Sequence, residues 1–342
     1  MDHWRRGHKQ MCKKIHRGGN AEQYHADKKY KEAVAVAVEA CADDTKGQTC
    51  YICTQALHWK TKEGLIRMCA CRGTAGFAHV SCLAEQAKIL VAEAEENNLD
   101  DKALNERWKR WNTCSLCEQQ YHGIVRCALG WACWKTNLGR PETDQLRSMA
   151  MNQLELGLFD AEYYEEALSV QEAQLAFLRR IGAPENDMLN AQNNLANTYR
   201  ALGRLDEVLR VRQEVYSGRL ALFGKEHGQT MTAASNYAMS LLEQNRRKEA
   251  KALLRKTLPV VRRVLGDTHE IAFRTRGIYA LALYQDPAAT LDDLHEAVDT
   301  LEDTERISRR VFGGAHPTTK GLGITLRDAQ AALRARETSS SR

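Results

Sequence analysis

Eight residues in the first third of the chain have the types and the spacing of metal ligands. They form four pairs, Cys50-x2-Cys53, Cys69-x-Cys71, His79-x2-Cys82 and Cys114-x2-Cys117. Zinc is four-coordinate in structural sites and prefers thiolate and imidazole, so eight such ligands suit two closed sites. One pair arises easily by chance, but four in series do not. The pattern therefore predicts two structural zinc ions as the cofactors.

The spacing also resembles one class of zinc module. One residue separates Cys69 from Cys71 and seven separate Cys71 from His79, as in the RING-CH (RINGv) family. The segments Cys69–Leu83, Trp111–Cys117 and Tyr121-His-Gly are similar to this family, and the resemblance covers about residues 48–124. It implies an interleaved cross-brace, with one zinc on Cys50, Cys53, His79 and Cys82 and the other on Cys69, Cys71, Cys114 and Cys117. Zinc binding and folding of this segment are then one process.

The RING-CH resemblance implies a ubiquitin ligase. Such modules hold a ubiquitin-conjugating enzyme and promote attack on its thioester, and they form no covalent intermediate, so the chain has no catalytic residue of its own. The expected contact surface is a shallow apolar groove between the zinc loops, formed by Ile52, Leu83 and Leu116. Trp111 is the fourth apolar residue here, and we expect it in the small core between the two metals.

Two departures from the RING pattern keep a second function open. The last cysteine pair encloses Ser115 and Leu116 where many active modules have a proline, and Glu118 stands where many have a basic residue. An ionised carboxylate cannot donate hydrogen bonds. The alternative is a non-catalytic scaffold in which the same parts only bind proteins. A histone-reading PHD finger fits the spacing poorly, and a methyltransferase lacks any cofactor-binding segment.

Residues 1–16 resemble the end of a MYND zinc finger. His8 and Cys12 match its last two ligands, but the six upstream cysteines are absent. Two ligands cannot close a tetrahedral site, so we assign no metal here. The segment is either the remnant of a truncated MYND finger or a basic helix.

Composition excludes several classes of function. The 342 residues predict two or three domains. A net charge of +5, from 49 basic and 44 acidic residues, requires no nucleic acid, and no apolar run reaches the roughly 20 residues that span a membrane. The polar, basic start predicts no secretory signal. We therefore expect a cytoplasmic protein, with the nucleus possible, in which Cys41, Cys127 and Cys133 are buried thiols.

Helices are expected on both sides of the zinc module at 46–125. Residues 17–45 carry an apolar stripe with helical spacing, so they form a helical linker that packs on a neighbouring domain. Residues 83–108, a long insertion between Cys82 and Cys114, also favour helix, broken at Asn97-Asn98. Residues 126–145 form a second helical linker.

The rest of the chain repeats with a period of 42 residues. Ala196, Ala238 and Ala280 occupy the same position in successive repeats. Glycines 182, 224 and 266 share a second equivalent position. Such a period predicts stacked two-helix units, because small alanines let helices approach and glycine ends a helix. Segments 193–199, 201–208 and 265–269 resemble tetratricopeptide repeats of the kinesin light chain kind. The resemblance covers 146–336, with a disordered tail at 337–342.

The fold class is therefore mainly α, a small two-zinc cross-brace RING-like module followed by an α-solenoid of helix-pair repeats. The repeats have no catalytic constellation, so their expected partner is a client protein or peptide. Asn194, Asn197 and Asn236 fall on the helices that line the binding face in the family, and they either bind an extended peptide or cap the array. His227, His269 and His316 recur at unit junctions, where a structural role is expected.

Overall fold

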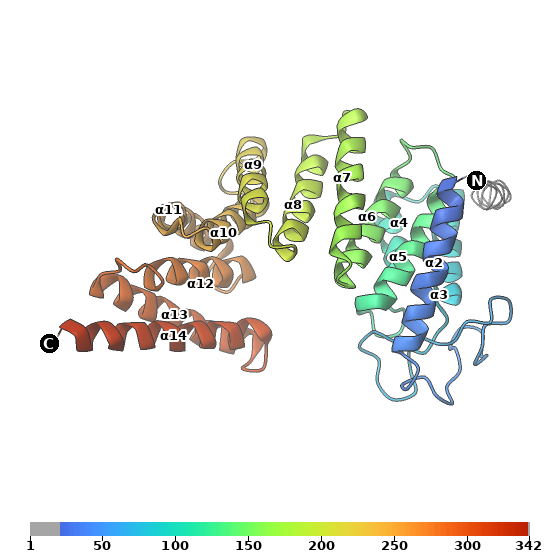
Figure 1. Ribbon diagram of the computed structural model, residues 1–342, viewed down its shortest axis with the longest axis horizontal. Coiled ribbons are helices and arrows are strands. Elements are labelled where there is room, and N and C mark those ends of the chain that lie inside the picture. Colours follow the sequence, from blue (N-terminus) through green and yellow to red (C-terminus); the bar gives the residue numbers. More distant parts are fainter. Residues whose placement is uncertain (1–20, 341–342) are drawn as a thin grey trace, which may run out of the picture. The chain divides into compact units, whose positions relative to one another are not determined.

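The computed structural model describes residues 21–340 (Figure 1). Their regular secondary structure is helical, apart from two isolated antiparallel bridges, Ile66 with Ala78 and Thr113 with Gln120. The chain divides into two compact units, one ending at Ile181 and the other starting at Gly182. The predicted MYND remnant, with His8 and Cys12, lies outside the described residues.

Unit one combines the loops that carry the candidate metal ligands with a group of helices. These are α2 (Ala21–Ala40), α3 (Val80–Glu96), α4 (Asp101–Trp108), the short 3-10 helix η1 (Lys109–Trp111), α5 (Gly123–Asn137), α6 (Gln145–Asp160) and α7 (Tyr164–Arg180). Helix α2 packs on α5 through its apolar stripe, which includes Tyr30, Ala33 and Ala37, as its sequence predicts. The insertion breaks where we expect it to. Helix α3 ends at Glu96, Asn98 is left-handed, and Asp100 caps α4 by accepting a hydrogen bond from the backbone of Ala103.

Helix α5 is the centre of unit one, although its sequence was interpreted as part of a linker at 126–145. Cys127, Leu129 and Cys133 are completely buried on it, which confirms the expected buried thiols, and Cys41 is buried as well. A side chain at Gly130 would meet the α6 backbone, and one at Gly157 would meet the α5 backbone. The two helices therefore approach as closely as glycine permits. The first predicted repeat, α6 and α7, accordingly belongs to unit one.

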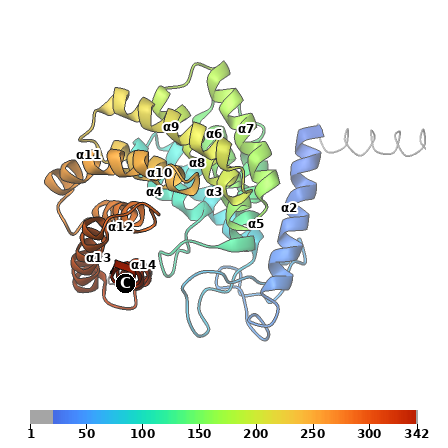
Figure 2. The same cartoon turned by 60° about the vertical axis from the view of Figure 1, so that its left-hand side comes forward.

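Unit two is a solenoid of helix pairs. Its helices are α8 (Glu185–Ala201), α9 (Leu205–Phe223), α10 (Gly228–Glu243), α11 (Arg247–Leu265), α12 (Glu270–Tyr284), α13 (Leu291–Phe312) and α14 (Pro317–Ser340). Each packs on the next one along the chain from α8 to α14 (Figure 2). Ala196, Ala238 and Ala280 are completely buried, as their 42-residue period predicts. Helix α14 continues through Ser340, so most of the tail that we expected to be disordered is helical.

The three junction histidines are helix caps. His227, His269 and His316 each accept a hydrogen bond at Nδ1 from the backbone N–H two residues later, at 3.2–3.3 Å. Each follows a glycine with positive φ by three residues, so the glycine ends one helix and the histidine starts the next. The histidines therefore stabilise the array, as expected from their positions.

His269→Ala should lower the free energy of unfolding of the array by about 1 kcal/mol, because it removes the acceptor that caps α12. Urea unfolding followed by circular dichroism measures this change. Asparagine is a good cap, so His269→Asn should restore most of the loss. Equal destabilisation by both substitutions would contradict the capping role.

Candidate metal centre

The two Cys-x2-Cys pairs adopt the same turn. In the first, Thr54 N–H donates to Cys50 O (2.8 Å) and Cys50 N–H to Gln55 O (3.0 Å). In the second, Glu118 N–H donates to Cys114 O (3.0 Å) and Cys114 N–H to Gln119 O (2.9 Å). The residue after each pair has a positive φ, and a backbone N–H inside each pair points at its first sulfur. Both turns thus present two sulfurs on one side. We call them the zinc knuckles, residues 50–55 and 114–119.

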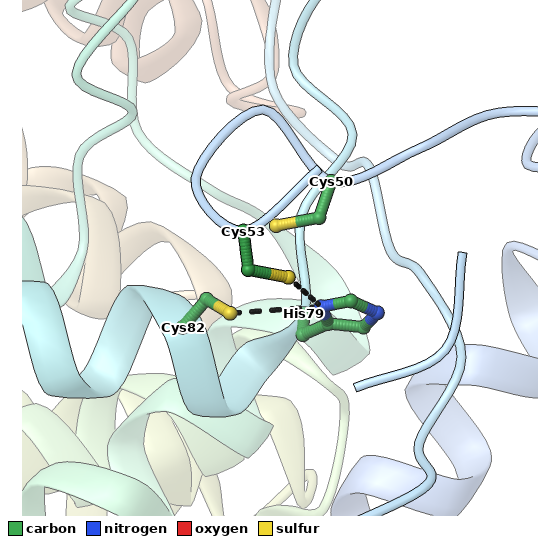
Figure 3. A group of neighbouring side chains, drawn as sticks. All are labelled: Cys50, Cys53, His79 and Cys82. Atoms are coloured by element: carbon green, nitrogen blue, oxygen red, sulfur yellow. Dashed lines mark hydrogen bonds between the residues drawn. The ribbon is translucent and has the colours of Figure 1, made fainter. Parts of the chain in front are cut away.

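The first ligand group comprises Cys50, Cys53, His79 and Cys82, drawn in Figure 3. His79 Nδ1 lies 3.4 Å from the Cys53 sulfur and 3.6 Å from the Cys82 sulfur. The other ring nitrogen, Nε2, is 3.3 Å from the carbonyl oxygen of Ala56, where it can donate its proton. That hydrogen bond leaves Nδ1 deprotonated and aimed at the sulfurs, which is the arrangement of a metal-ligating histidine.

The second group comprises Cys69, Cys71, Cys114 and Cys117. The sulfurs of Cys71 and Cys114 are 3.7 Å apart. Gly76 has a φ of +86°, and a Cβ there would lie 2.6 Å from the Cβ of Cys71 and 2.9 Å from its sulfur. Only glycine lets the loop pass this close to the ligand.

The distances fit a tetrahedral ion in each group. With Zn–S of about 2.3 Å and Zn–N of about 2.0–2.1 Å, the ligand atoms of a tetrahedral site lie about 3.6–3.8 Å apart. The ligand atoms of each group all lie within 4.8 Å of one another. Both groups are the sets implied by the interleaved cross-brace, and both can hold a metal ion.

A metal ion needs deprotonated ligands, and the surroundings favour the deprotonated form at some of these residues and oppose it at others. Burial lowers the pKa of His79, which keeps its imidazole neutral. Burial raises the pKa of Cys82 well above its usual value. Burial opposes ionisation of Cys117 too, but hydrogen bonds from the Gln119 backbone and from neighbouring cysteines lower its pKa to about 7. A bound cation would compensate the charge of the buried thiolates.

Two of the three aliphatic residues expected in a partner-binding groove are exposed. Ile52 and Leu116 occupy equivalent positions on the two zinc knuckles, with 37% and 51% of their surface exposed. A hydrogen bond of 2.9 Å between the hydroxyls of Tyr51 and Ser115 joins the knuckles, which places the two aliphatic side chains on adjacent loops. The expectation that Leu83 contributes to this surface is wrong. It is only 3% exposed, because it belongs to the stripe of α3 that packs into the core. Trp111 is buried, as expected.

Glu118 does not present a free carboxylate beside the second knuckle. Arg110 of η1 binds it with both guanidinium nitrogens, at 2.9 and 3.2 Å, and also approaches the carbonyl oxygen of Cys114 at 3.4 Å. The side chain of Arg110 is mostly buried and that of Glu118 is mostly exposed. The position after the last ligand is therefore acidic but neutralised.

In unit two, two of the asparagines that were expected to bind a peptide form hydrogen bonds with arginines. Asn197 Oδ1 accepts a hydrogen bond from Arg212, and Asn236 Oδ1 accepts one from Arg274. Asn194, on the same helix as Asn197, is half-buried. These side chains come from α8 and α10, and the arginines come from α9 and α12.

The two buried arginines of α9 are functional candidates that the repeat pattern of the sequence does not indicate. Arg212 and Arg219 are 6% and 5% exposed, and their guanidinium groups bond to neutral amides. Arg212 binds Asn193 and Asn197, whereas Arg219 binds Asn186, Asn190 and Gln229. Neither forms an ion pair with a carboxylate in the described part of unit two. Burial and the charges of Arg274 and Arg200 lower the pKa of Arg212 to about 10. The four α8 asparagines that bond to these arginines, Asn186, Asn190, Asn193 and Asn197, are spaced so that they lie on one helix face, and this spacing is the signal in the sequence.

Comparison with known proteins supports the repeats. The tetratricopeptide repeat family matches residues 187–263, so unit two contains tetratricopeptide repeats, a class of protein-interaction module. No curated protein sequence matches the chain. No helix in residues 21–340 is long and apolar enough to cross a membrane.

Among solved structures, the chain is similar to a protein from Podosopora anserina. That structure is described as the nearly identical TPR-like repeats of a kinesin light chain. The identity is 20%, the TM-score is 0.48, and the match covers 57% of this chain and 90% of that one. BtubC (BKLC) from P. vanneervenii is 13% identical with a TM-score of 0.45, covering 77% and 91%. A Rap protein complexed with competence and sporulation factor is 14% identical with a TM-score of 0.43, covering 73% and 72%.

Proposed function

We propose that the protein is a RING-type ubiquitin ligase. Its zinc module, residues 46–125, recruits a ubiquitin-conjugating enzyme, and its repeat array, residues 146–336, binds the client. The observation that carries the proposal is the pair of joined zinc knuckles, each presenting an exposed aliphatic side chain, Ile52 and Leu116, beside a ligand group of RING-CH spacing. Exposed apolar residues on rigid loops are typical of protein-binding surfaces.

Zinc is the metal that the two ligand groups favour, because seven thiols and one imidazole are soft and borderline donors. In this role zinc is structural. It holds the knuckles in place while all eight ligands are occupied, so no cysteine of the groups is free for a thioester with ubiquitin. Transfer would occur directly from the conjugating enzyme to the client, with the module acting by positioning.

The arginines of unit two support an acidic client. Arg212 and Arg219 place positive charge among amides of α8, and neither forms an ion pair with a carboxylate in the described part of unit two, although Glu243 lies near enough to raise the pKa of Arg212 slightly against the larger lowering effects. An acidic peptide lying over these helices would offset the cost of keeping the two charges buried. Asn194, Asn197 and Asn236 would then support the binding face, with the amides of Asn197 and Asn236 orienting arginines.

A non-catalytic scaffold is the second candidate, and Glu118 favours it. Its carboxylate accepts both hydrogen bonds of Arg110, so this position offers no donor to a conjugating enzyme. The scaffold would keep the zinc module and the repeats as binding surfaces without promoting transfer.

Ubiquitination by the purified, zinc-loaded chain tests the proposal. With a panel of conjugating enzymes, the parent should form ubiquitin chains on itself, and Ile52→Ala should reduce the initial rate at least about fivefold, because buried aliphatic contacts at an interface contribute about 1–3 kcal/mol. Leu57→Ala is the matched control, because Leu57 is also exposed but lies outside the knuckles. Its rate should change less than twofold.

The scaffold predicts a different outcome. Absence of ubiquitin chains with every conjugating enzyme, from protein shown to hold two zinc ions and to be folded, would exclude the ligase. The scaffold would then explain the same surfaces, and Glu118→Arg would be the substitution that tests whether the carboxylate blocks activity.

A further inference from the structure

A groove of about 810 Å³ lies in unit one, away from the two exposed aliphatics of the zinc knuckles. Its walls come from α2, α3, α5 and the loop between Cys53 and Cys69. Helices α2 and α3 both pack on α5 (Figure 1). Residues Ser81, Ala84, Glu85 and Lys88 form one face of α3 that borders it. Leu116 and Ile52 do not line it. The groove is therefore a second surface of unit one, distinct from the knuckle surface.

Trp59 stands at the edge of this groove with 69% of its surface exposed. The turn that carries it is closed by backbone hydrogen bonds, from His58 N–H to Glu63 O (3.0 Å) and from Lys62 N–H to His58 O (2.9 Å). His58 Nδ1 also accepts a hydrogen bond from Thr61 N–H at 3.1 Å. The tryptophan is thus presented on an ordered turn, which lowers the entropic cost of using it in binding.

The turn is also attached to α3. The Glu63 carboxylate accepts hydrogen bonds from the backbone N–H and the hydroxyl of Ser81, at 2.7 and 2.8 Å, and Ser81 in turn bonds to the hydroxyl of Tyr30 at 3.1 Å. The ring of His58 packs edge-on against the ligand His79, with the ring centres 5.4 Å apart. The wall of the groove and the first metal site are therefore built from one connected network.

The lining of the groove is basic. It contains three lysines, Lys60, Lys88 and Lys135, against one acidic residue, Glu85. Lys88 and Glu85 form only an exposed pair at 3.4 Å, which contributes little. Lys135 lies 4.2 Å from the centre of the Tyr30 ring and 3.1 Å from Asp27, whereas Lys60 has no ion pair among the described residues. The surface combines positive charge with an exposed aromatic anchor.

We propose that this groove binds an acidic peptide segment of a partner protein, with an apolar side chain against Trp59 and carboxylates toward Lys60 and Lys88. Charge complementarity argues for an acidic occupant, and an exposed, preorganised tryptophan is the residue type that dominates binding energy at interfaces. This site is independent of the ligase proposal, because it shares no residue with the knuckle surface or with the repeats.

Peptide display on the zinc-loaded full chain tests the site. A random library of 12-residue peptides should yield sequences rich in Asp and Glu with one apolar residue. The consensus peptide, labelled with fluorescein, should bind at least tenfold more weakly to Trp59→Ala and to the double variant Lys60→Glu/Lys88→Glu. Its affinity should fall further as salt is raised, because the lysines are exposed.

The control is the double variant Lys31→Glu/Lys102→Glu, which changes the net charge equally at exposed lysines outside the groove. It should bind within twofold of the parent, as should Arg212→Met in unit two. The zinc content of all variants, and the thermal unfolding of the groove and control lysine variants, should match the parent. The proposal is overturned by enriched peptides that are not acidic, by equal binding to the groove variants, or by loss of binding in Arg212→Met alone.

Discussion

Removal of zinc should unfold unit one and leave unit two folded. Structural zinc sites contribute roughly 10–16 kcal/mol of apparent binding free energy each, which exceeds the total stability of most domains. The ligands lie inside the core, where Cys50, Cys82 and Cys114 pack among the apolar residues of α3 and α5. Unit two has a separate core on α10 to α14. Hydrogen exchange followed by mass spectrometry, with and without a zinc chelator, should show protection lost over 50–122 and kept over 228–312.

Single ligand substitutions should separate the two sites. Cys82→Ser and Cys117→Ser should each reduce bound zinc from two ions per chain, with the larger loss of structure in Cys82→Ser, because His79 and Cys82 start α3. Cys133→Ala is the control. Its thiol is buried but belongs to neither group, so the chain should keep both ions. Two ions bound to Cys82→Ser, or protection of 50–122 that survives chelation, would contradict the metal centre.

The four ligand pairs could be predicted from the sequence because the geometry of each pair is local. A Cys-x2-Cys turn brings two sulfurs together whatever surrounds it, and only the pairing of the four turns depends on the fold. The repeats were accessible for a similar reason. Ala196, Ala238 and Ala280 make the same buried helix contact in three successive repeats. The junctions of glycine and histidine recur in the same way. Repetition turns a weak local signal into a strong one.

Other features depend on packing between distant segments. Leu83 is buried because α3 turns the stripe of Val80, Leu83, Ala87 and Val91 into the core of unit one, and the packing of α3 on α5 decides which face of the helix is covered. The central position of α5 depends on Gly130 and Gly157, which meet from different helices. Burial of Arg212 depends on amide acceptors that lie 15 and 19 residues away on α8. The asparagine spacing marks one face of α8, but only the packing of α8 on α9 shows that Arg212 meets this face.

The partner of Glu118 likewise depends on packing that the sequence does not indicate. Arg110 lies eight residues earlier, in a 3-10 turn that the sequence did not predict, and this turn brings the guanidinium back to the second knuckle. The pair is partly exposed, so its contribution to stability is small. Its consequence is electrostatic, because it cancels the negative charge beside the surface that a conjugating enzyme would contact.

Arg212→Met should keep or raise the stability of unit two while removing its affinity for acidic peptides. The lowering of the Arg212 pKa from 12.5 to about 10 means that the charged side chain costs the folded state about 3 kcal/mol at neutral pH, since one pKa unit is 1.36 kcal/mol. Its hydrogen bonds to Asn193 and Asn197 recover part of this cost. An apolar side chain of similar length pays no such desolvation cost, and replacing buried charges in this way is often neutral or stabilising.

Two measurements on Arg212→Met decide between a structural and a binding role for the arginine. Urea unfolding should give a free energy equal to that of the parent or higher. With Lys60→Glu/Lys88→Glu present in both proteins, so that the groove of unit one does not bind acidic peptide, a fluorescein-labelled hexaglutamate peptide at low salt should bind at least tenfold more weakly when Arg212→Met is added. Arg210→Met is the matched control, because Arg210 lies on the same helix but is exposed and paired with Glu214. It should change neither quantity appreciably. If Arg212→Met instead lost more than about 2 kcal/mol of stability with unchanged peptide binding, the guanidinium would be a structural link between α8 and α9.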